Sequence, residues 1–213
     1  MNFSNCRGDM FVIGLTGGIG TGKTQASKLL EELGAAIIDA DAVGHEAYRP
    51  HTEAWGAVVE AFGQDVIAPS GEVDRKKLGG IVFGDPKALR RLNAIMHPRM
   101  YSMVEERIDN LKQMGRDVVV VEAALLLEAG WTALVDEVWS VSASEDRVVR
   151  RLARRNNLDQ EAVRARIRSQ MPQSQRTKQA DILIDNSGSL ADLRRRIQQL
   201  WNSRVPAHQG EHT

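Results

Sequence analysis

The feature that most constrains the fold of this chain is a glycine-rich segment near its N-terminal end. Residues 17–24, Gly-Gly-Ile-Gly-Thr-Gly-Lys-Thr, fit the pattern G-x-x-x-x-G-K-[ST]. They lie between Phe11–Thr16, an apolar run typical of a buried strand, and Gln25–Leu33, where leucines recur at helical spacing. Glycines let successive N–H groups face one anion, and a helix N-terminus adds favourable potential. The segment therefore predicts a phosphate-binding loop.

The last two residues of the loop add chemistry to its shape. Lys23 is expected to bridge the β- and γ-phosphates of a nucleoside triphosphate, and the Thr24 hydroxyl to bind Mg²⁺. The alternative is a plain glycine-rich turn, but the flanking strand and helix favour the phosphate-binding loop. By itself the loop specifies a nucleoside triphosphate and no acceptor.

Further apolar runs predict an α/β domain. Gly34 is expected to end the first helix, and Ala35–Asp39 to form a second strand. Because strand, helix and strand follow one another within a short stretch, we expect a parallel sheet. The other strands are expected at Asp117–Val121, Val135–Ser142 and Asp181–Asp185, with helices from Ser144, at Asp159–Gln170 and from Ser189 to about Trp201.

Residues 42–115 interrupt this pattern. They contain helical spacings and polar turns but no convincing strand, which predicts a helical insertion. Asp85 and Pro86 are typical of a helix N-cap followed by proline at the first helical position. A long return helix is expected at Met100–Met114.

Composition and charge argue against several functional classes. Lys and Arg number 28 and so do Asp and Glu, so net charge gives no reason to expect nucleic acid or an acidic membrane as partner. The single cysteine, Cys6, excludes an internal disulfide framework and favours a reducing, cytoplasmic setting. The most apolar stretch, Val118–Val135, contains Glu122 and Glu128, so we expect no membrane span. The sequence indicates no obligate protein partner.

Two carboxylates follow the second predicted strand. Asp39 and Asp41 lie at the carboxyl end of a strand, where ligands of open α/β sheets collect. A carboxylate there can accept a proton from an acceptor hydroxyl, or hold Mg²⁺ through water. It can equally be the N-cap of the next helix. Position alone leaves these interpretations open.

A run of arginines bears on the choice between a switch protein and a kinase. The run consists of Arg147, Arg150, Arg151, Arg154 and Arg155. At helical spacing all but Arg150 share one face. We favour a mobile basic lid over transferring phosphates, ahead of a solvated face or a nucleic-acid patch. The last is disfavoured because no aromatic residue is interleaved for base stacking.

Segments in a fixed order extend from about Val12 to Trp201. They are Gly14–Thr24, Gly34–Asp41, Phe62-Gly63, Asp74-Arg75 with Leu78, Val82-Phe83 with Asp85-Pro86, Leu92–Pro98, Leu125–Gly130, Gln170-Met171 and Ile184–Gly188. Together they resemble the dephospho-coenzyme A kinases, which carry out the last step of coenzyme A biosynthesis. Many enzymes share the loop, whereas the combination of Asp-Ala-Asp, His-Pro and Asp-Asn-Ser-Gly is far more specific.

The resemblance implies a P-loop kinase fold, an α/β fold with a five-stranded parallel sheet flanked by helices, a helical substrate-binding insertion and an Arg-rich lid. It implies a nucleotide-binding core at 10–41 and 116–203, a lid at about 145–172 and an acceptor domain at 42–115. Residues 1–9 and 204–213 are expected to be flexible ends, with Met10 as an alternative start. The implied reaction transfers the ATP γ-phosphate to the ribose 3′-hydroxyl of dephospho-CoA.

The resemblance also implies catalytic roles. Asp41 matches the carboxylate thought to act as base toward the acceptor hydroxyl. Lys23, Arg151 and Arg155 are expected to neutralise charge on the transferring phosphate. Two further carboxylates are candidates by position and not through the resemblance. Asp39 follows the second predicted strand, and Glu122 ends the third, where many relatives carry a different residue. Either can hold Mg²⁺ through water, and a buried structural role for Glu122 is the alternative.

Binding roles follow in the same way. Asn186 matches an Asn near the adenine, while Arg75 and His97 fall in segments that form the acceptor's pocket. His97 can equally cap or pack the insertion. Nucleotide contacts from the loop are expected at Gly18, Gly20, Thr21, Gly22, Lys23, Thr24 and Gln25.

Three other functions remain as alternatives. The first is a kinase of the same fold acting on another small molecule or a nucleoside monophosphate. The second is a P-loop switch protein, which the lack of an Asn-Lys-x-Asp segment disfavours. The third is an arginine-rich nucleic-acid binder, which would show salt-sensitive binding.

Overall fold

The computed structural model describes residues 10–156 and 159–206, without the side chains of residues 155, 156 and 162. The expected flexible end at residues 1–9 and positions 207–213 of the expected C-terminal tail lie outside this described part. The chain divides into two compact units, Asp39–Arg107 and the remainder.

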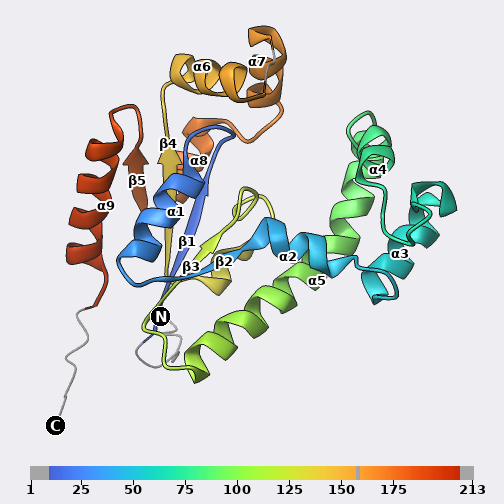
Figure 1. Cartoon of the computed structure of the whole chain (residues 1–213), viewed down its shortest axis with the longest axis horizontal. Helices are drawn as coiled ribbons and strands as arrows, with labels where there is room; N and C mark the ends of the chain where they lie inside the picture. Colours follow the sequence, from blue (N-terminus) through green and yellow to red (C-terminus); the bar gives the residue numbers. More distant parts are fainter. Residues whose placement is uncertain (1–9, 157–158, 207–213) are drawn as a thin grey trace. The chain divides into compact units, whose positions relative to one another are not determined.

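The larger unit is built on a five-stranded sheet (Figure 1). Its strands are β1 (Phe11–Gly17), β2 (Ala36–Asp39), β3 (Val118–Glu122), β4 (Glu137–Ser142) and β5 (Ile182–Asp185). They are arranged in the order β2-β3-β1-β4-β5, and the β1–β3, β1–β4 and β4–β5 ladders are parallel. The structure thus confirms the predicted parallel sheet.

Continuous apolar runs explain why β1 and β3 lie inside the sheet. Val12 and Ile13 of β1 are fully buried, and so are Val119 and Val120 of β3. Consecutive residues in a strand point to opposite faces, so burial of neighbours means that both faces are covered. This is the pattern of a parallel sheet between helices.

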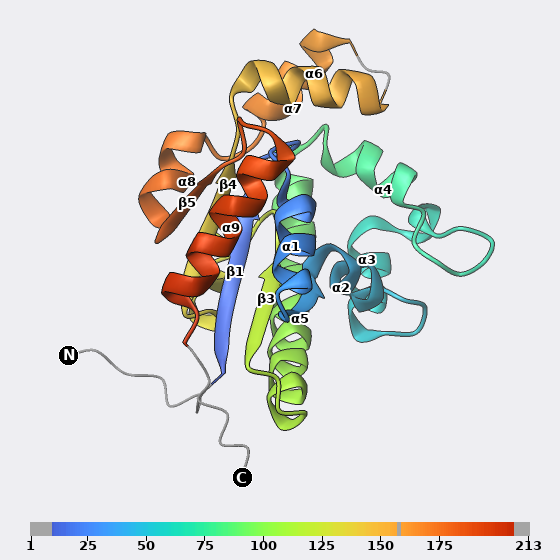
Figure 2. The same cartoon turned by 60° about the vertical axis from the view of Figure 1, so that its left-hand side comes forward.

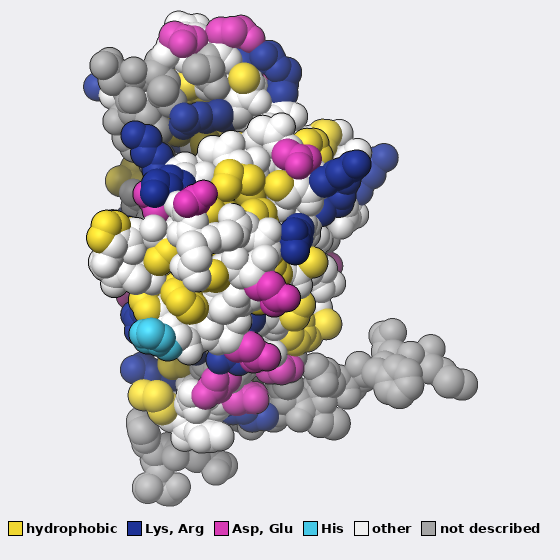
Figure 3. Space-filling model, turned by 90° about the vertical axis from the view of Figure 1, so that its right-hand side faces the viewer, with side chains coloured by type: hydrophobic (Ala, Val, Ile, Leu, Met, Phe, Trp, Pro, Cys, Tyr) yellow, Lys and Arg dark blue, Asp and Glu magenta, His cyan; other side chains and the backbone are white. Residues whose placement is uncertain are grey.

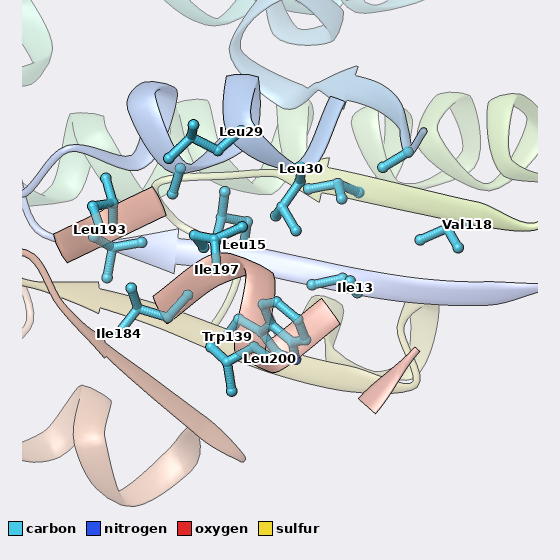
Figure 4. Close-up of a cluster of buried hydrophobic side chains, with 14 residues drawn as sticks. Ile13, Leu15, Leu29, Leu30, Val118, Trp139, Ile184, Leu193, Ile197 and Leu200 are labelled. Atoms are coloured by element: carbon cyan, nitrogen blue, oxygen red, sulfur yellow. The ribbon is translucent and has the colours of Figure 1, made fainter. Parts of the chain in front are cut away.

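Helices α1 (Lys23–Glu32) and α9 (Leu190–Arg204) pack together on the sheet (Figures 2 and 4). One cluster of buried side chains includes Leu29 and Leu30 of α1, Leu193 of α9 and Trp139 of β4. Ser189 caps α9 through a reciprocal capping box with Asp192, as the sequence predicts for Ser189. This packing fixes the start of α1 at the end of β1.

Three helices lie between β4 and β5. They are α6 (Glu145–Asn156), α7 (Gln160–Arg168) and α8 (Gln173–Gln179). Val148 and Leu152 of α6 pack with Val163 of α7, and Ile19 of the glycine-rich loop contacts the same cluster. The sequence predicts α6 and α7. It does not predict α8, whose residues are all polar and show no apolar repeat.

The smaller unit is helical beyond Asp39, the last residue of β2. It contains α2 (Ala40–Ala47), α3 (Glu53–Phe62), α4 (Arg75–Val82) and most of α5 (Pro86–Gln113). Short 3-10 helices occur at Gln64–Val66 here and at Trp131–Leu134 in the larger unit. The core of the smaller unit includes Val58, Val66, Leu78 and Met96.

Helix α5 is longer than the predicted return helix at Met100–Met114. It starts at Pro86 and runs through Pro98. A proline inside a helix removes one backbone hydrogen bond at a cost of about 3 kcal/mol. Leu89, Leu92 and Met96 pack in the core of the smaller unit on the N-terminal side of Pro98, which explains why the helix continues. The Asp85 carboxylate accepts from Lys87 N at 2.8 Å, as expected for the N-cap.

The surface carries charges of both signs. Figure 3 shows basic and acidic side chains on one face of the molecule, with hydrophobic atoms exposed between them. No helix within the described residues is long and apolar enough to cross a membrane.

Candidate active site

The glycine-rich loop connects β1 directly to α1 and depends on glycine at specific positions. Gly20 and Gly22 have φ values of 71° and 101°, in the region that favours glycine. A Cβ at Gly22 would lie 2.2 Å from the side-chain nitrogen of Asn186, and one at Gly20 2.9 Å from Leu152. The close neighbours and the backbone angles therefore both require glycine here.

The loop is held from outside by the segment after β5. The Asn186 Nδ2 donates to the Thr21 carbonyl oxygen at 2.7 Å, and Asn186 is 5% exposed. Within the loop, the buried Thr21 hydroxyl donates to the Gly18 carbonyl at 2.9 Å. The structure thus uses the Asn186 side chain to shape the loop. The backbone N–H of the exposed Gln25 donates to the Gly22 carbonyl oxygen at 3.0 Å, at the start of α1.

Two arginines of α6 reach the same region. Arg151 donates to the carbonyl oxygens of Asn186 at 3.1 Å and Thr21 at 3.4 Å. Arg147 donates to the carbonyls of Ser187 and Gly188. Burial, and then the charge of Arg147, lower the pKa of Arg151. A partly desolvated cation beside another cation favours a bound anion such as phosphate.

The other arginines of the run differ in placement. Arg154 is exposed, and the exposed Arg150 donates to the Asp146 carbonyl one turn earlier. The side chain of Arg155 lies outside the described residues. Among ion pairs between described residues, none includes Arg147 or Arg151. Their charge is therefore not balanced by a described carboxylate.

Lys23 and Thr24 begin α1, and each side chain has a described partner. The Lys23 ammonium donates to the Gly17 carbonyl at 3.0 Å. The Thr24 hydroxyl donates to Glu122 Oε1 at 3.0 Å. Glu122 reaches Thr24 because β3 pairs with β1, with Glu122 opposite Leu15. Of the two carboxylates suggested by the sequence, Glu122 is the one that contacts Thr24.

This hydroxyl–carboxylate pair fits a Mg²⁺ ion. Mg²⁺ prefers oxygen ligands, keeps several waters, and is commonly held by one or two protein groups together with substrate phosphates. No group of three or more metal-ligating side chains was found among the described residues, and a nucleotide-bound Mg²⁺ does not need one. Thr24 would bind the ion, with Glu122 behind it.

Asp39 and Asp41 have different environments at the start of α2. The Asp39 side chain is the N-cap and accepts from the N–H groups of Asp41 at 2.9 Å and Ala42 at 3.2 Å. Asp41 is exposed in the first turn, and no hydrogen bond between described residues involves its carboxylate. The two roles considered for this pair are therefore divided between its members. Asp39 is the N-cap of α2, whereas the Asp41 carboxylate is available for other chemistry.

The acceptor residues expected in the smaller unit are Arg75 and His97. Arg75 Nη1 lies 2.8 Å from His45 Nε2, and because arginine only donates, the His45 nitrogen accepts this hydrogen bond. His97 lies in α5, and burial lowers its pKa. The sequence did not single out His45, although it lies four positions after Asp41 and therefore on the same helix face.

Two contacts near the loop were not expected from the sequence. Gln170 occurs in a segment of the family pattern, and its Oε1 accepts from Ile19 N at 2.7 Å. Arg147 belongs to the arginine run, and its contact with the 187–188 carbonyls needs the fold to be seen. Both contacts join segments that are distant in sequence, so only the three-dimensional structure reveals them.

Comparisons with known proteins agree with this geometry. The family model for dephospho-CoA kinase matches residues 11–192. A dephospho-CoA kinase of Geobacter sulfurreducens is 44% identical over 197 residues, 92% of this chain and 100% of that protein. The solved dephospho-CoA kinase from Campylobacter jejuni is 25% identical with a TM-score of 0.68, covering 91% of this chain and 96% of that one. Shikimate kinase from Bacteroides thetaiotaomicron, at 15% identity and a TM-score of 0.55, shares the fold. The phosphate-binding loop and the parallel sheet agree with the family pattern, which extends over most of the length. The chain therefore belongs to the dephospho-CoA kinase family.

Proposed function

We propose that this protein transfers the γ-phosphate of ATP to the ribose 3′-hydroxyl of dephospho-CoA, which yields coenzyme A and ADP. The proposal rests on the glycine-rich loop, which Asn186 and Arg151 hold in place through the Thr21 carbonyl. The chain that contains this loop matches the kinase family over residues 11–192. Such a loop binds the phosphates of the donor, and the family relationship supplies the acceptor.

Donor binding rests on residues of the larger unit. Loop N–H groups and the N-terminus of α1 bind the phosphates. Lys23 and Arg151 neutralise the negative charge that develops during transfer, and Arg155 is proposed to join them. Mg²⁺, held by Thr24 with Glu122 behind it, supplies further charge neutralisation when bound.

Acceptor activation is assigned to the smaller unit. Asp41 accepts the proton of the attacking 3′-hydroxyl, for which its exposed carboxylate is available. Arg75 and His97 are proposed to bind the acceptor. The proposed division assigns residues 42–115 to the acceptor domain and about 145–172 to a lid that excludes water. Cytoplasmic location, and independence of nucleic acid and of an obligate protein partner, are part of the proposal.

The direct test is ADP release from ATP and Mg²⁺ with dephospho-CoA as acceptor, with the product identified by mass. Adenosine, AMP and pantetheine 4′-phosphate serve as parallel acceptors. Rapid turnover with dephospho-CoA alone supports the proposal. Turnover only with another acceptor would retain ATP as donor and reject the substrate assignment.

A further inference from the structure

A contact between distant parts of the chain joins the tip of the glycine-rich loop to the end of the α6–α7 segment. Ile19 N donates to Gln170 Oε1 at 2.7 Å, a short and partly buried hydrogen bond. The same Gln170 oxygen lies 3.6 Å from the position that a Cβ would occupy at Gly18. Gln170 therefore lies directly against the loop.

Gln170 is itself held in place by its neighbours. Its own N–H donates to the Ile167 carbonyl at 3.2 Å, at the end of α7. The carbonyl of the next residue, Met171, accepts from Arg176 Nη1 at 3.1 Å. The Gln170 side chain thus projects from a backbone that is fixed on both sides.

Arg176 connects this segment to the chain after β3. It is 2% exposed, and its Nη2 donates to Glu128 Oε1 at 3.0 Å. Buried arginines are uncommon unless paired, and here the pair ties α8 to the Leu125–Gly130 segment. An ion pair made by a buried arginine and two hydrogen bonds to the backbone at residues 170 and 171 therefore support the single bond from Gln170 to the loop.

We propose that Gln170 is a positioning residue of the phosphate-binding loop, with Arg176 and Glu128 as its anchor. The loop is rich in glycine and has large backbone freedom. Asn186 and Arg151 fix the loop at Thr21, whereas Gln170 fixes it at Ile19, on the other side of Gly20. With both points held, the remaining N–H groups converge on the donor phosphates before ATP binds. The inference rests on ATP as the donor and is independent of the acceptor.

Two substitutions separate this role from packing. Gln170→Met keeps the length and volume of the side chain but removes the acceptor oxygen, whereas Gln170→Glu retains an acceptor. Gln175→Ala, at an exposed glutamine of α8, is the matched control. Amide hydrogen exchange at Ile19, ATP binding by calorimetry, KM for ATP and for the acceptor, and the melting temperature are measured on the full chain.

We expect amide exchange at Ile19 in Gln170→Met to accelerate about tenfold, as for one lost hydrogen bond. ATP binding should weaken about tenfold, and KM for ATP should rise about tenfold. KM for the acceptor and the melting temperature should stay near those of the unsubstituted protein. Gln170→Glu should restore slow exchange at Ile19, and Gln175→Ala should change nothing.

Three results would overturn the inference. In the first, Gln170→Met leaves exchange and ATP binding unchanged. In the second, its melting temperature falls while KM for ATP does not rise, which would make Gln170 a packing residue. In the third, it binds ATP more tightly, which would mean that Gln170 competes with the phosphates. Because exchange and ATP binding need no acceptor, failure of the dephospho-CoA assignment would leave these tests intact.

Discussion

The side-chain nitrogen of Asn186 lies 2.7 Å from the carbonyl oxygen of Thr21, and a Cβ on the neighbouring Gly22 would approach that nitrogen to 2.2 Å. The space beside Gly22 is thus filled by the group that shapes the loop. The identity of residue 22 and the position of Asn186 depend on each other.

Gly22→Ala should weaken ATP binding at least tenfold. The φ of 101° costs a non-glycine residue about 1–3 kcal/mol, and the added methyl must displace Asn186 from Thr21. Calorimetric titration with ATP measures the loss. Gly115→Ala is the control, because Gly115 has a φ of 71° but, its chain neighbours aside, no described atom within 4 Å of its Cβ position. It should lose about 1 kcal/mol of stability and keep ATP binding. Equal ATP affinities in the two variants would disprove the expectation.

Asp41→Asn should lower kcat at least about 100-fold and leave ATP binding nearly unchanged, because the amide cannot accept the hydroxyl proton. The side chain is exposed in the first turn of α2, so the fold should tolerate the change. Steady-state kinetics with dephospho-CoA and ATP titrations measure the two effects. The exposed Asp65→Asn is the control. Near-normal turnover of Asp41→Asn would remove the base from the proposed mechanism.

Glu122→Gln should raise the Mg²⁺ concentration needed for half-maximal activity about tenfold. The amide oxygen still accepts from Thr24, so the contact at 3.0 Å can persist while the negative charge is lost. Thr24→Ser should behave as the unsubstituted protein, since it retains the hydroxyl, and Thr24→Ala should not. The measurement is a Mg²⁺ titration of initial rates, with the exposed Glu31→Gln as control. An unchanged Mg²⁺ requirement would make Glu122 a structural carboxylate.

His97 should make stability depend on pH. Burial lowers its pKa below the ordinary value of 6.5, so the unfolded chain binds this proton first as the pH falls. The free energy of unfolding should therefore be highest above pH 6.5 and decrease as the pH falls toward the pKa of the folded state. Urea unfolding at about pH 7.5 and about pH 5.5 measures this loss. His97→Gln should reduce it, and an equal loss in both proteins would contradict the assignment.

The sheet could be predicted because its strands are short apolar runs. The Asp117–Val121 run predicts β3 without reference to any neighbour, and the Phe11–Thr16 run does the same for β1. Local patterns fail where long-range packing decides. Pro98 predicts a helix boundary. Helix α5 nevertheless continues through it, because the helical segments before and after Pro98 both pack against buried side chains. Helix α8 has no apolar face at all.

The candidate site was predictable to a similar degree. A short contiguous motif identifies Lys23 and Thr24, because the spacing of its residues is itself typical of a phosphate-binding loop. Glu122 was one of two candidates, and only the β1–β3 register shows that it reaches Thr24. Gln170 and His45 depend on contacts across the fold with Ile19 and Arg75, and no spacing in one sequence encodes such contacts.

The two outer strands of the sheet have a consequence for self-association. β2 and β5 have only four residues each, and Asp181 precedes β5 while Asp185 is its last residue. A strand this short offers few unpaired backbone groups to a second chain, and carboxylates at both ends repel a copy of itself. Extension of β5 by substitution of Asp181 and Asp185 with β-branched residues should therefore promote aggregation.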